Sequence, residues 1–142
     1  MDANELSLRF VSVIPRTMRI YRKEIRNAAK SEFTIPQVRV MSYLNQHDFA
    51  SNLELSEHVG IPAAMMSRLI DTLVRQGWVK RKISPEDRRQ IRISLTPQGK
   101  RRFSTIQKAT RETFSRIFSQ FNETEQRTID RGLSLLGEAF GP

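Results

Sequence analysis

The sequence predicts a mainly α-helical chain with one small β-hairpin, and two patterns of apolar residues support this fold class. Along most of the chain, apolar residues recur every three or four positions, which is the spacing of amphipathic helices. Residues 78–83 and 91–95 instead alternate apolar and polar side chains, as strands with one buried face do. The chain has 142 residues, of which 38% are hydrophobic. This length suits one domain with helical extensions.

Two amphipathic helices are predicted in the first third of the chain. The apolar positions of the first are Phe10, Ile14, Met18, Tyr21, Ile25 and Ala28. Pro15 should either kink this helix or mark a new start, because proline has no amide hydrogen to donate. The second helix is predicted to begin with Thr34 as its cap, Pro36 in its first turn and Gln37 at the capping-box position. Its predicted core stripe is Val38, Met41 and either Leu44 or Tyr43.

A pair of short helices follows. Residues 51–54 form a capping-box pattern before a helix over 53–59, which Gly60 is suited to end. The next helix is predicted over residues 62–76 and stops at Gly77. Its inward face carries Met66, Leu69, Ile70 and Leu73, and its outward face carries Ala64, Arg68, Asp71 and Arg75. Two helices joined by a short turn that contains glycine predict a helix-turn-helix.

The alternating segments Trp78–Ile83 and Ile91–Leu95 flank a charged tip over residues 84–90 and predict a hairpin. Thr96 and Pro97 then begin a long helix with apolar positions Phe103, Ile106, Phe114, Ile117, Phe118 and Phe121. A capping box over 122–125 precedes a last helix, whose stripe is Ile129, Leu133, Leu136 and Phe140. A helix-turn-helix followed by a hairpin predicts a winged helix-turn-helix.

Positive charge is concentrated in the middle of the chain. Residues 1–59 hold eight Lys and Arg against seven Asp and Glu, residues 60–102 hold eleven against three, and residues 103–142 hold five against five. The three net charges are therefore +1, +8 and 0, within a total of +9. An excess localised in this way indicates an anion-binding module rather than a generally basic surface.

From Thr34 to Gly99 the chain resembles the multiple antibiotic resistance regulator (MarR) family of winged helix-turn-helix transcription factors. The most specific residues are Gly77-Trp78-Val79-Lys80-Arg81, Pro85-Glu86-Asp87-Arg88-Arg89 and Leu95-Thr96-Pro97-Gln98-Gly99. The resemblance implies a DNA-binding module over residues 34–99, with N- and C-terminal dimerisation helices in residues 1–33 and 100–142. It also implies a homodimer that binds double-stranded DNA at an inverted-repeat operator and acts as a ligand-responsive repressor.

The second helix of the pair is the expected recognition helix. Its candidate DNA-binding residues are Pro62, Ala63, Ala64, Met65, Ser67, Arg68 and Arg75. Arg68 is the first candidate for a contact to guanine or to a phosphate. Ala63, Ala64 and Met65 have side chains that form no hydrogen bonds, so they either pack on thymine methyl groups or only favour the helix. Pro62 either leaves N–H groups free for a phosphate or only starts the helix.

The charged tip is the expected wing, with Asp87, Arg88 and Arg89 as its DNA-binding residues. One guanidinium is expected to enter the minor groove while the carboxylate holds the other, and the sequence leaves open which is which. The alternative is a solvated turn with an exposed ion pair of little energetic value. On the strands, the residues expected either to contact phosphates or to stay solvated are Lys80, Arg81, Lys82 and Arg92.

Other function classes find less support. The chain has no cysteine, and its two histidines, His47 and His58, have no second ligand at helical or hairpin spacing. No catalytic residues, cofactor or metal are therefore expected. No membrane span or secretory signal is apparent, so we expect a cytoplasmic protein. The alternative function is a winged helix that binds RNA or a protein partner. A small aromatic effector is implied by the resemblance alone, and no residues are assigned to it.

Overall fold

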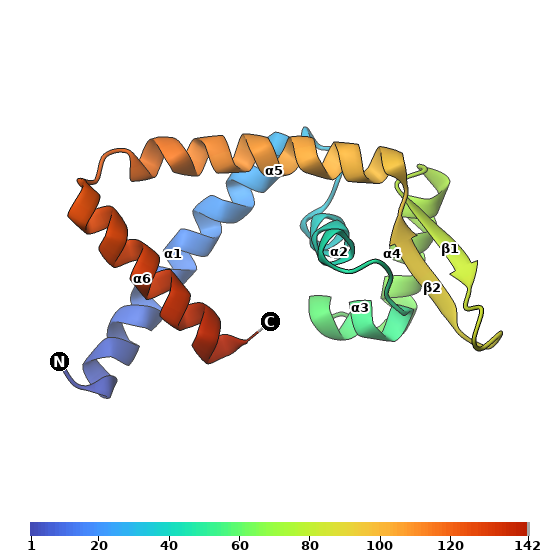
Figure 1. Cartoon of the computed structure of the whole chain (residues 1–142), viewed down its shortest axis with the longest axis horizontal. Helices are drawn as coiled ribbons and strands as arrows, with labels where there is room; N and C mark the ends of the chain where they lie inside the picture. The colour runs from blue at the N-terminus through green and yellow to red at the C-terminus, as the bar shows by residue number, and fades with distance from the viewer. Residues whose placement is uncertain (142) are drawn as a thin grey trace. The chain divides into compact units, whose positions relative to one another are not determined.

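The computed structural model describes residues 1–141 (Figure 1). The described elements are α1 (Ala3–Ala29), α2 (Ile35–Gln46), α3 (Asn52–Val59), α4 (Ala63–Arg75), β1 (Val79–Ile83), β2 (Ile91–Leu95), α5 (Pro97–Phe118) and α6 (Glu123–Phe140). This order confirms the predicted mainly helical winged fold. The chain divides into two compact units, Met1–Thr110 and a second unit that begins at Arg111.

The starts of α2 and α6 are set by side-chain capping boxes, as the sequence predicted. The Thr34 hydroxyl accepts the Gln37 N–H, and the Gln37 side chain accepts the Thr34 N–H in return. Asn122 and Glu125 form the same reciprocal box before α6. Each cap satisfies N–H groups that have no partner inside the helix, which is worth about 1 kcal/mol. Asp2 forms a further capping box before α1 that the sequence analysis did not predict.

Helix α1 continues through Pro15 as one element of 27 residues. Of the two outcomes predicted for this proline, a new helix start is therefore not realised. The helix ends where Lys30 and Ser31 adopt positive φ angles of 50° and 62°. Only its last turns enter the core, through Ile25 and Ala29.

The core of the first unit is built around α2, where Val40 and Met41 are completely buried. Helix α4 contributes Met66, Ile70 and Leu73, while Leu69 is half-buried, so its predicted inward face is confirmed. Ile25 and Ala29 before residue 34, and Phe103 and Ile106 after residue 99, are buried in the same cluster. Burial of the larger side chains, Ile25, Phe103 and Ile106, contributes about 1.5–3 kcal/mol each. The core of the winged module thus extends beyond residues 34–99 at both ends.

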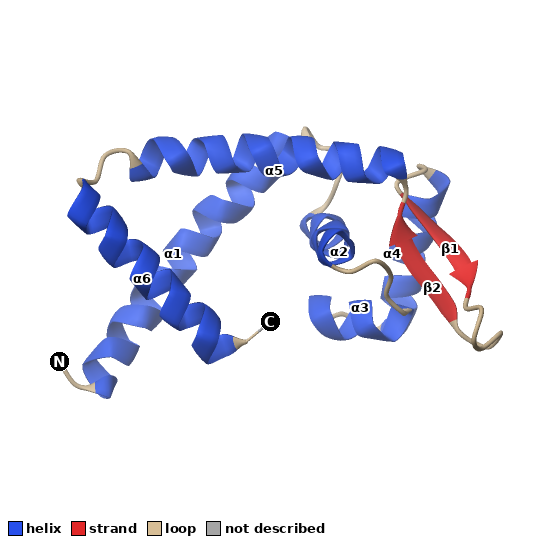
Figure 2. Cartoon of the chain, in the orientation of Figure 1, coloured by secondary structure: helices blue, strands red, loops and turns tan. Residues whose placement is uncertain are grey.

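The two strands form an antiparallel hairpin whose register runs from Val79↔Leu95 to Ile83↔Ile91 (Figure 2). Ala50 adds one more bridge by exchanging two backbone hydrogen bonds with Ile93. Trp78 lies just outside β1 and packs against Phe33 with ring centroids 5.3 Å apart. The hairpin is therefore attached to the segment that precedes α3 as well as to the helices beside it.

Gly99 allows the close approach of α5 to the start of the hairpin. A Cβ at this position would lie 2.0 Å from the Trp78 carbonyl oxygen, closer than any real contact. The Thr96 hydroxyl donates to the Gly77 carbonyl at 2.6 Å and accepts from the Gly99 N–H at 3.0 Å. Threonine and glycine are thus both needed where β2 turns into α5.

The second unit contains the end of α5 and the whole of α6. Ile129 and Leu136 of the predicted α6 stripe are half-buried, whereas Leu133 is 59% exposed. A shallow hollow beside this stripe is lined by Phe118, Gln126, Ile129, Asp130 and Leu133. The apolar stripe predicted from the sequence is present, but the described residues of the chain do not bury it.

Candidate nucleic-acid interface

The turn between α3 and α4 presents the N-terminal end of α4 to solvent. Gly60 ends α3 with a φ of +79°, and Pro62 is the N-cap residue of α4 rather than its first helical residue. No side chain caps this helix start, because the proline has no polar group to offer. Since the first N–H groups of a helix carry the positive end of its dipole, this end favours an anion such as a phosphate.

The outward face of α4 is exposed as predicted. Met66, Ile70 and Leu73 face the core, which leaves the opposite side of the helix to solvent. Six of the seven predicted DNA-binding residues lie on the helix and are exposed: Ala63, Ala64, Met65, Ser67, Arg68 and Arg75. The seventh, Pro62, is exposed just before the helix begins. The structure thus places these predicted residues on one accessible surface.

Asn52, the first residue of α3, fixes the N-terminal half of α4. Its Nδ2 donates to the Ala63 carbonyl at 3.1 Å, and its Oδ1 accepts from the Ser67 hydroxyl at 3.4 Å. The single hydroxyl hydrogen of Ser67 is therefore directed at the protein, which qualifies its prediction as a base-reading residue. The sequence carried no sign of this role for Asn52, because its partners are 11 and 15 residues away.

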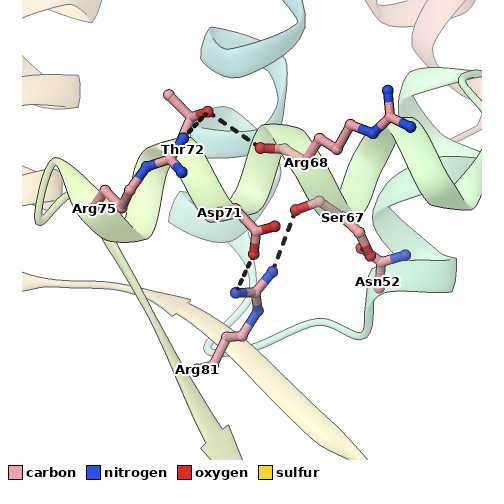
Figure 3. Close-up of polar contacts among 7 residues, drawn as sticks. All are labelled: Asn52, Ser67, Arg68, Asp71, Thr72, Arg75 and Arg81. Atoms are coloured by element: carbon pink, nitrogen blue, oxygen red, sulfur yellow. Dashed lines mark hydrogen bonds and ion pairs between the residues drawn. The ribbon is translucent and has the colours of Figure 1, made fainter.

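Arg81 of β1 links the wing to the middle of α4 (Figure 3). Its guanidinium pairs with the Asp71 carboxylate at 2.6 Å and donates to the Ser67 carbonyl at 3.3 Å. Asp71 lies on the outward face of α4, where an unpaired carboxylate would repel phosphates. The pairing neutralises that charge and uses Arg81 inside the protein, so Arg81 is less available to DNA than the sequence suggested.

Arg68 is the cation of α4 that is directed most clearly to solvent. Its side chain extends along the helix away from Asp71 and Arg81 (Figure 3), and no described residue forms an ion pair with it. Arg75, about two helical turns after Arg68, donates to the Thr72 hydroxyl at 3.3 Å. A guanidinium without an internal partner keeps all its donors for a ligand.

The wing tip is shaped by backbone contacts. The Asp87 carboxylate accepts the Arg89 N–H at 2.9 Å, and the Asp87 carbonyl accepts the Gln90 N–H at 3.0 Å. The expected pairing of Asp87 with a guanidinium is not formed within residues 1–141, because the carboxylate caps the turn instead. Both Arg88 and Arg89 are exposed and have no ion-pair partner in the described chain.

The cations of the strands differ in their surroundings. Arg92 stacks on the Phe49 ring, with its guanidinium carbon 4.0 Å from the ring centroid, and pairs with the Glu86 carboxylate. Its side chain is only 26% exposed. Lys80 and Lys82 alternate with Arg81 along β1, so they lie on the other face of the hairpin, and both are exposed. Of the strand positions predicted to contact phosphates, these two lysines are the ones open to solvent.

The two histidines lie together at the ends of α2 and α3. Tyr43 stacks on His47 with ring centroids 4.0 Å apart and contacts His58 at 4.7 Å. Partial burial lowers the pKa of His58 below its ordinary 6.5, and the positive charges of Arg39 and His47 lower it further. Among residues 1–141, no group of three or more His, Asp or Glu side chains could hold a metal ion. None of the described helices is long and apolar enough to cross a membrane.

Comparison with known proteins agrees with this geometry. Residues 33–91 match the family model described as "MarR family". Over 111 residues, 78% of this chain and 69% of the relative, the chain is 29% identical to the HTH-type transcriptional regulator YfiV of Bacillus subtilis. It is 27% identical to the HTH-type transcriptional repressor IacR of Pseudomonas putida over 75% of this chain and 64% of the relative, just under two thirds of that protein.

Solved structures of the same fold cover nearly the whole chain. The crystal structure of RV1404 from Mycobacterium tuberculosis matches with a TM-score of 0.84 at 23% identity, over 99% of this chain and 95% of that one. At this identity the likeness concerns the fold alone, and the relatives and the family model supply the assignment. Residues 33–91 thus match the MarR family, and the relatives that this chain resembles are HTH-type transcription regulators.

Proposed function

We propose that the chain is a homodimeric repressor that binds an inverted-repeat operator in double-stranded DNA. In this proposal, residues 34–99 contain the DNA-binding module, and residues 1–33 and 100–142 supply the dimerisation helices. Helix α4 lies in the major groove and the tip of the wing reaches the minor groove, which are the usual placements for these elements. The coarser conclusion, a DNA-binding transcription regulator, follows from the family.

One observation carries the proposal. Arg68 on α4 and Arg88 and Arg89 on the wing are exposed and have no ion-pair partner within residues 1–141. All three lie in the segment 60–102, which has a net charge of +8. Neutralisation of phosphates by such a segment contributes affinity that does not depend on the DNA sequence. Sequence specificity would come from the residues of α4 that contact the base edges.

Exposed apolar side chains support the dimer. On α1 they include Leu6, Leu8, Val11 and Val13, and on α6 they include Leu133 and Leu135. So many exposed large apolar side chains on each of these helices are consistent with an interaction site. A two-fold dimer also presents two copies of α4, which suits an operator with two symmetric half-sites.

Repression, effector control and cellular location are the remaining parts of the proposal. Repression is proposed because the related IacR of Pseudomonas putida is named as a repressor. A small aromatic effector that releases the DNA is proposed from the family resemblance, and the described residues assign no site to it. Such an effector would have to bind the free and the DNA-bound conformations with different affinity. We propose the cytoplasm as the location, because that is where the DNA lies.

The direct test is binding of the purified full chain to duplex DNA taken from upstream of its own gene. Scrambled DNA and duplex RNA of equal length serve as competitors, and fluorescence anisotropy is measured across a range of salt concentrations. We expect preferential DNA binding, weakened about 5- to 150-fold by Arg68→Ala, the range for loss of one good base contact. Arg89→Ala is expected to weaken it as well, whereas the exposed Arg111→Ala outside the module is the matched control.

Either of two results would contradict the proposal. Equal affinity for the three nucleic acids, governed only by salt, would exclude specific DNA recognition. A preference for the RNA duplex would favour the alternative, a winged helix that binds RNA. The same titration with candidate aromatic acids present tests the effector, since release of bound DNA requires a lower anisotropy at constant protein concentration.

A further inference from the structure

We propose that Ala64 and Met65 at the start of α4 read thymine methyl groups, next to a guanine that Arg68 contacts. The inference rests on the proposed function, because it specifies which bases the operator half-site contains. It depends on which exposed side chains in the N-terminal half of α4 form no contact inside the protein and can therefore contact a base. That half is the part of a recognition helix that approaches the base edges.

The Ser67 hydroxyl, the polar side-chain group nearest to Ala64 and Met65 along the chain, already forms a hydrogen bond inside the protein. The Ser67 hydroxyl donates to Asn52 Oδ1, and the amide of Asn52 donates to the Ala63 carbonyl. The Ser67 carbonyl accepts from Arg81, which holds this turn of the helix from the wing side (Figure 3). Ser67 is therefore a positioning residue for α4, and its one donor hydrogen points away from a ligand.

What remains exposed before Arg68 is apolar. Ala63 and Ala64 present only methyl groups, and Met65 is 54% exposed although its side chain is apolar and flexible. Met66 is completely buried, so only one methionine of the pair is available. In the major groove, the thymine 5-methyl is the one apolar group on a base edge. Apolar side chains at this point thus have one complementary partner among the four bases.

Arg68 would form the hydrogen bonds to the base next to these thymines. Its guanidinium extends from the next turn of α4 and has no ion-pair partner in the described chain. A free guanidinium forms its most specific major-groove contact with the O6 and N7 acceptors of guanine. Since Ala64 and Arg68 are four residues apart, they lie on the same face of the helix. The half-site is therefore expected to place thymine beside guanine.

The test removes single methyl groups from the DNA. The full chain first selects its preferred duplex from a random library, and each thymine of one half-site is then replaced singly by deoxyuridine. This change removes the 5-methyl and leaves every hydrogen-bonding group of the base in place. At one or two of these thymines, we expect the wild-type protein to lose about fourfold in affinity, as for one methyl-sized group returned to water.

Variants of Met65 assign that loss to the protein side. Met65→Gln keeps the length and helix preference of the side chain but should abolish the difference between thymine and deoxyuridine at the thymine that Met65 contacts, whereas Met65→Leu should preserve it. Arg68→Ala should lower affinity for both duplexes and leave the difference unchanged. Because Met65 is exposed, these variants are expected to fold, which circular dichroism checks.

Two outcomes overturn the inference while leaving the proposed function intact. In one, every thymine of the half-site tolerates deoxyuridine within twofold for the wild-type protein. In the other, Met65→Gln keeps the full wild-type discrimination. A selection that returns no preferred duplex would instead overturn the proposed function itself.

Discussion

His58 lies at the C-terminal end of α3, where Tyr43 packs beside it and the Arg39 guanidinium donates to its carbonyl at 3.0 Å. Partial burial lowers its pKa below 6.5, with Arg39 and then His47 adding to the effect. Arg39 also donates to the Val59 carbonyl at 3.0 Å, so it satisfies two carbonyls at the end of α3. A proton on His58 therefore adds positive charge at a point where α2 holds α3.

This arrangement predicts lower stability in mild acid. Because the folded state binds the proton of His58 less well than the unfolded chain does, the free energy of unfolding should fall as the pH drops below about 7. His58→Gln should reduce the difference between pH 7.5 and pH 5.5, measured by urea unfolding. His47→Gln should retain most of it, since burial of His58 is the main cause. An equal pH dependence in wild type and His58→Gln would show that other groups are responsible.

At the scale of elements, the wing depends on contacts that its own strands do not supply. Arg92 of β2 stacks on Phe49, which precedes α3, and pairs with Glu86 at the tip. The Ser84 hydroxyl, on a buried residue, also donates to the Glu86 carboxylate at 3.4 Å. Cation–π contact and a partly exposed ion pair are each worth about 0.5–1 kcal/mol. Together they fix the tip relative to the segment before α3.

We therefore expect Arg92 to position the wing rather than to bind phosphate. Arg92→Gln should lower the free energy of unfolding by about 1 kcal/mol. It should leave the dependence of DNA affinity on salt nearly unchanged. Lys82→Gln, the control on the exposed face of β1, should leave stability unchanged and reduce the salt slope by about 1. A comparable reduction of the salt slope in Arg92→Gln would instead identify Arg92 as a phosphate contact.

The whole molecule exposes apolar surface that a second copy of the chain could cover. If the α6 stripe forms part of a dimer interface, Leu133→Asp should place an unpaired charge there and shift the protein from dimer to monomer. Light scattering measures this shift, with the 16.5 kDa chain as the monomer mass. Ser134→Asp, an exposed polar position of α6 outside the apolar stripe, adds the same charge and should leave the dimer intact. An unchanged mass for Leu133→Asp would place the interface elsewhere.

Much of this architecture could be predicted because it depends on short-range patterns. The caps at Thr34, Ser51 and Asn122 form where the sequence places a polar residue before an apolar run. The hairpin follows from the alternation of apolar and polar residues over 78–83 and 91–95. The exposed face of α4, with Arg68 at its centre, follows from helical periodicity. Each signal lies within a few residues of the feature that it determines.

The amino-acid sequence alone predicted the order of the elements, the exposed face of α4, the charged tip of the hairpin and the family resemblance. Only the folded structure shows which polar groups remain available to a ligand. Asn52 engages Ser67, Arg81 engages Asp71, and Phe49 with Glu86 engages Arg92. Asn52 and Ser67, Asp71 and Arg81, and Phe49 and Arg92 lie in different segments of the chain, and they meet only when the core packs α3, α4 and the hairpin together. The physical reason is that periodicity fixes the face of an element on which a side chain lies, whereas packing between elements fixes its neighbour.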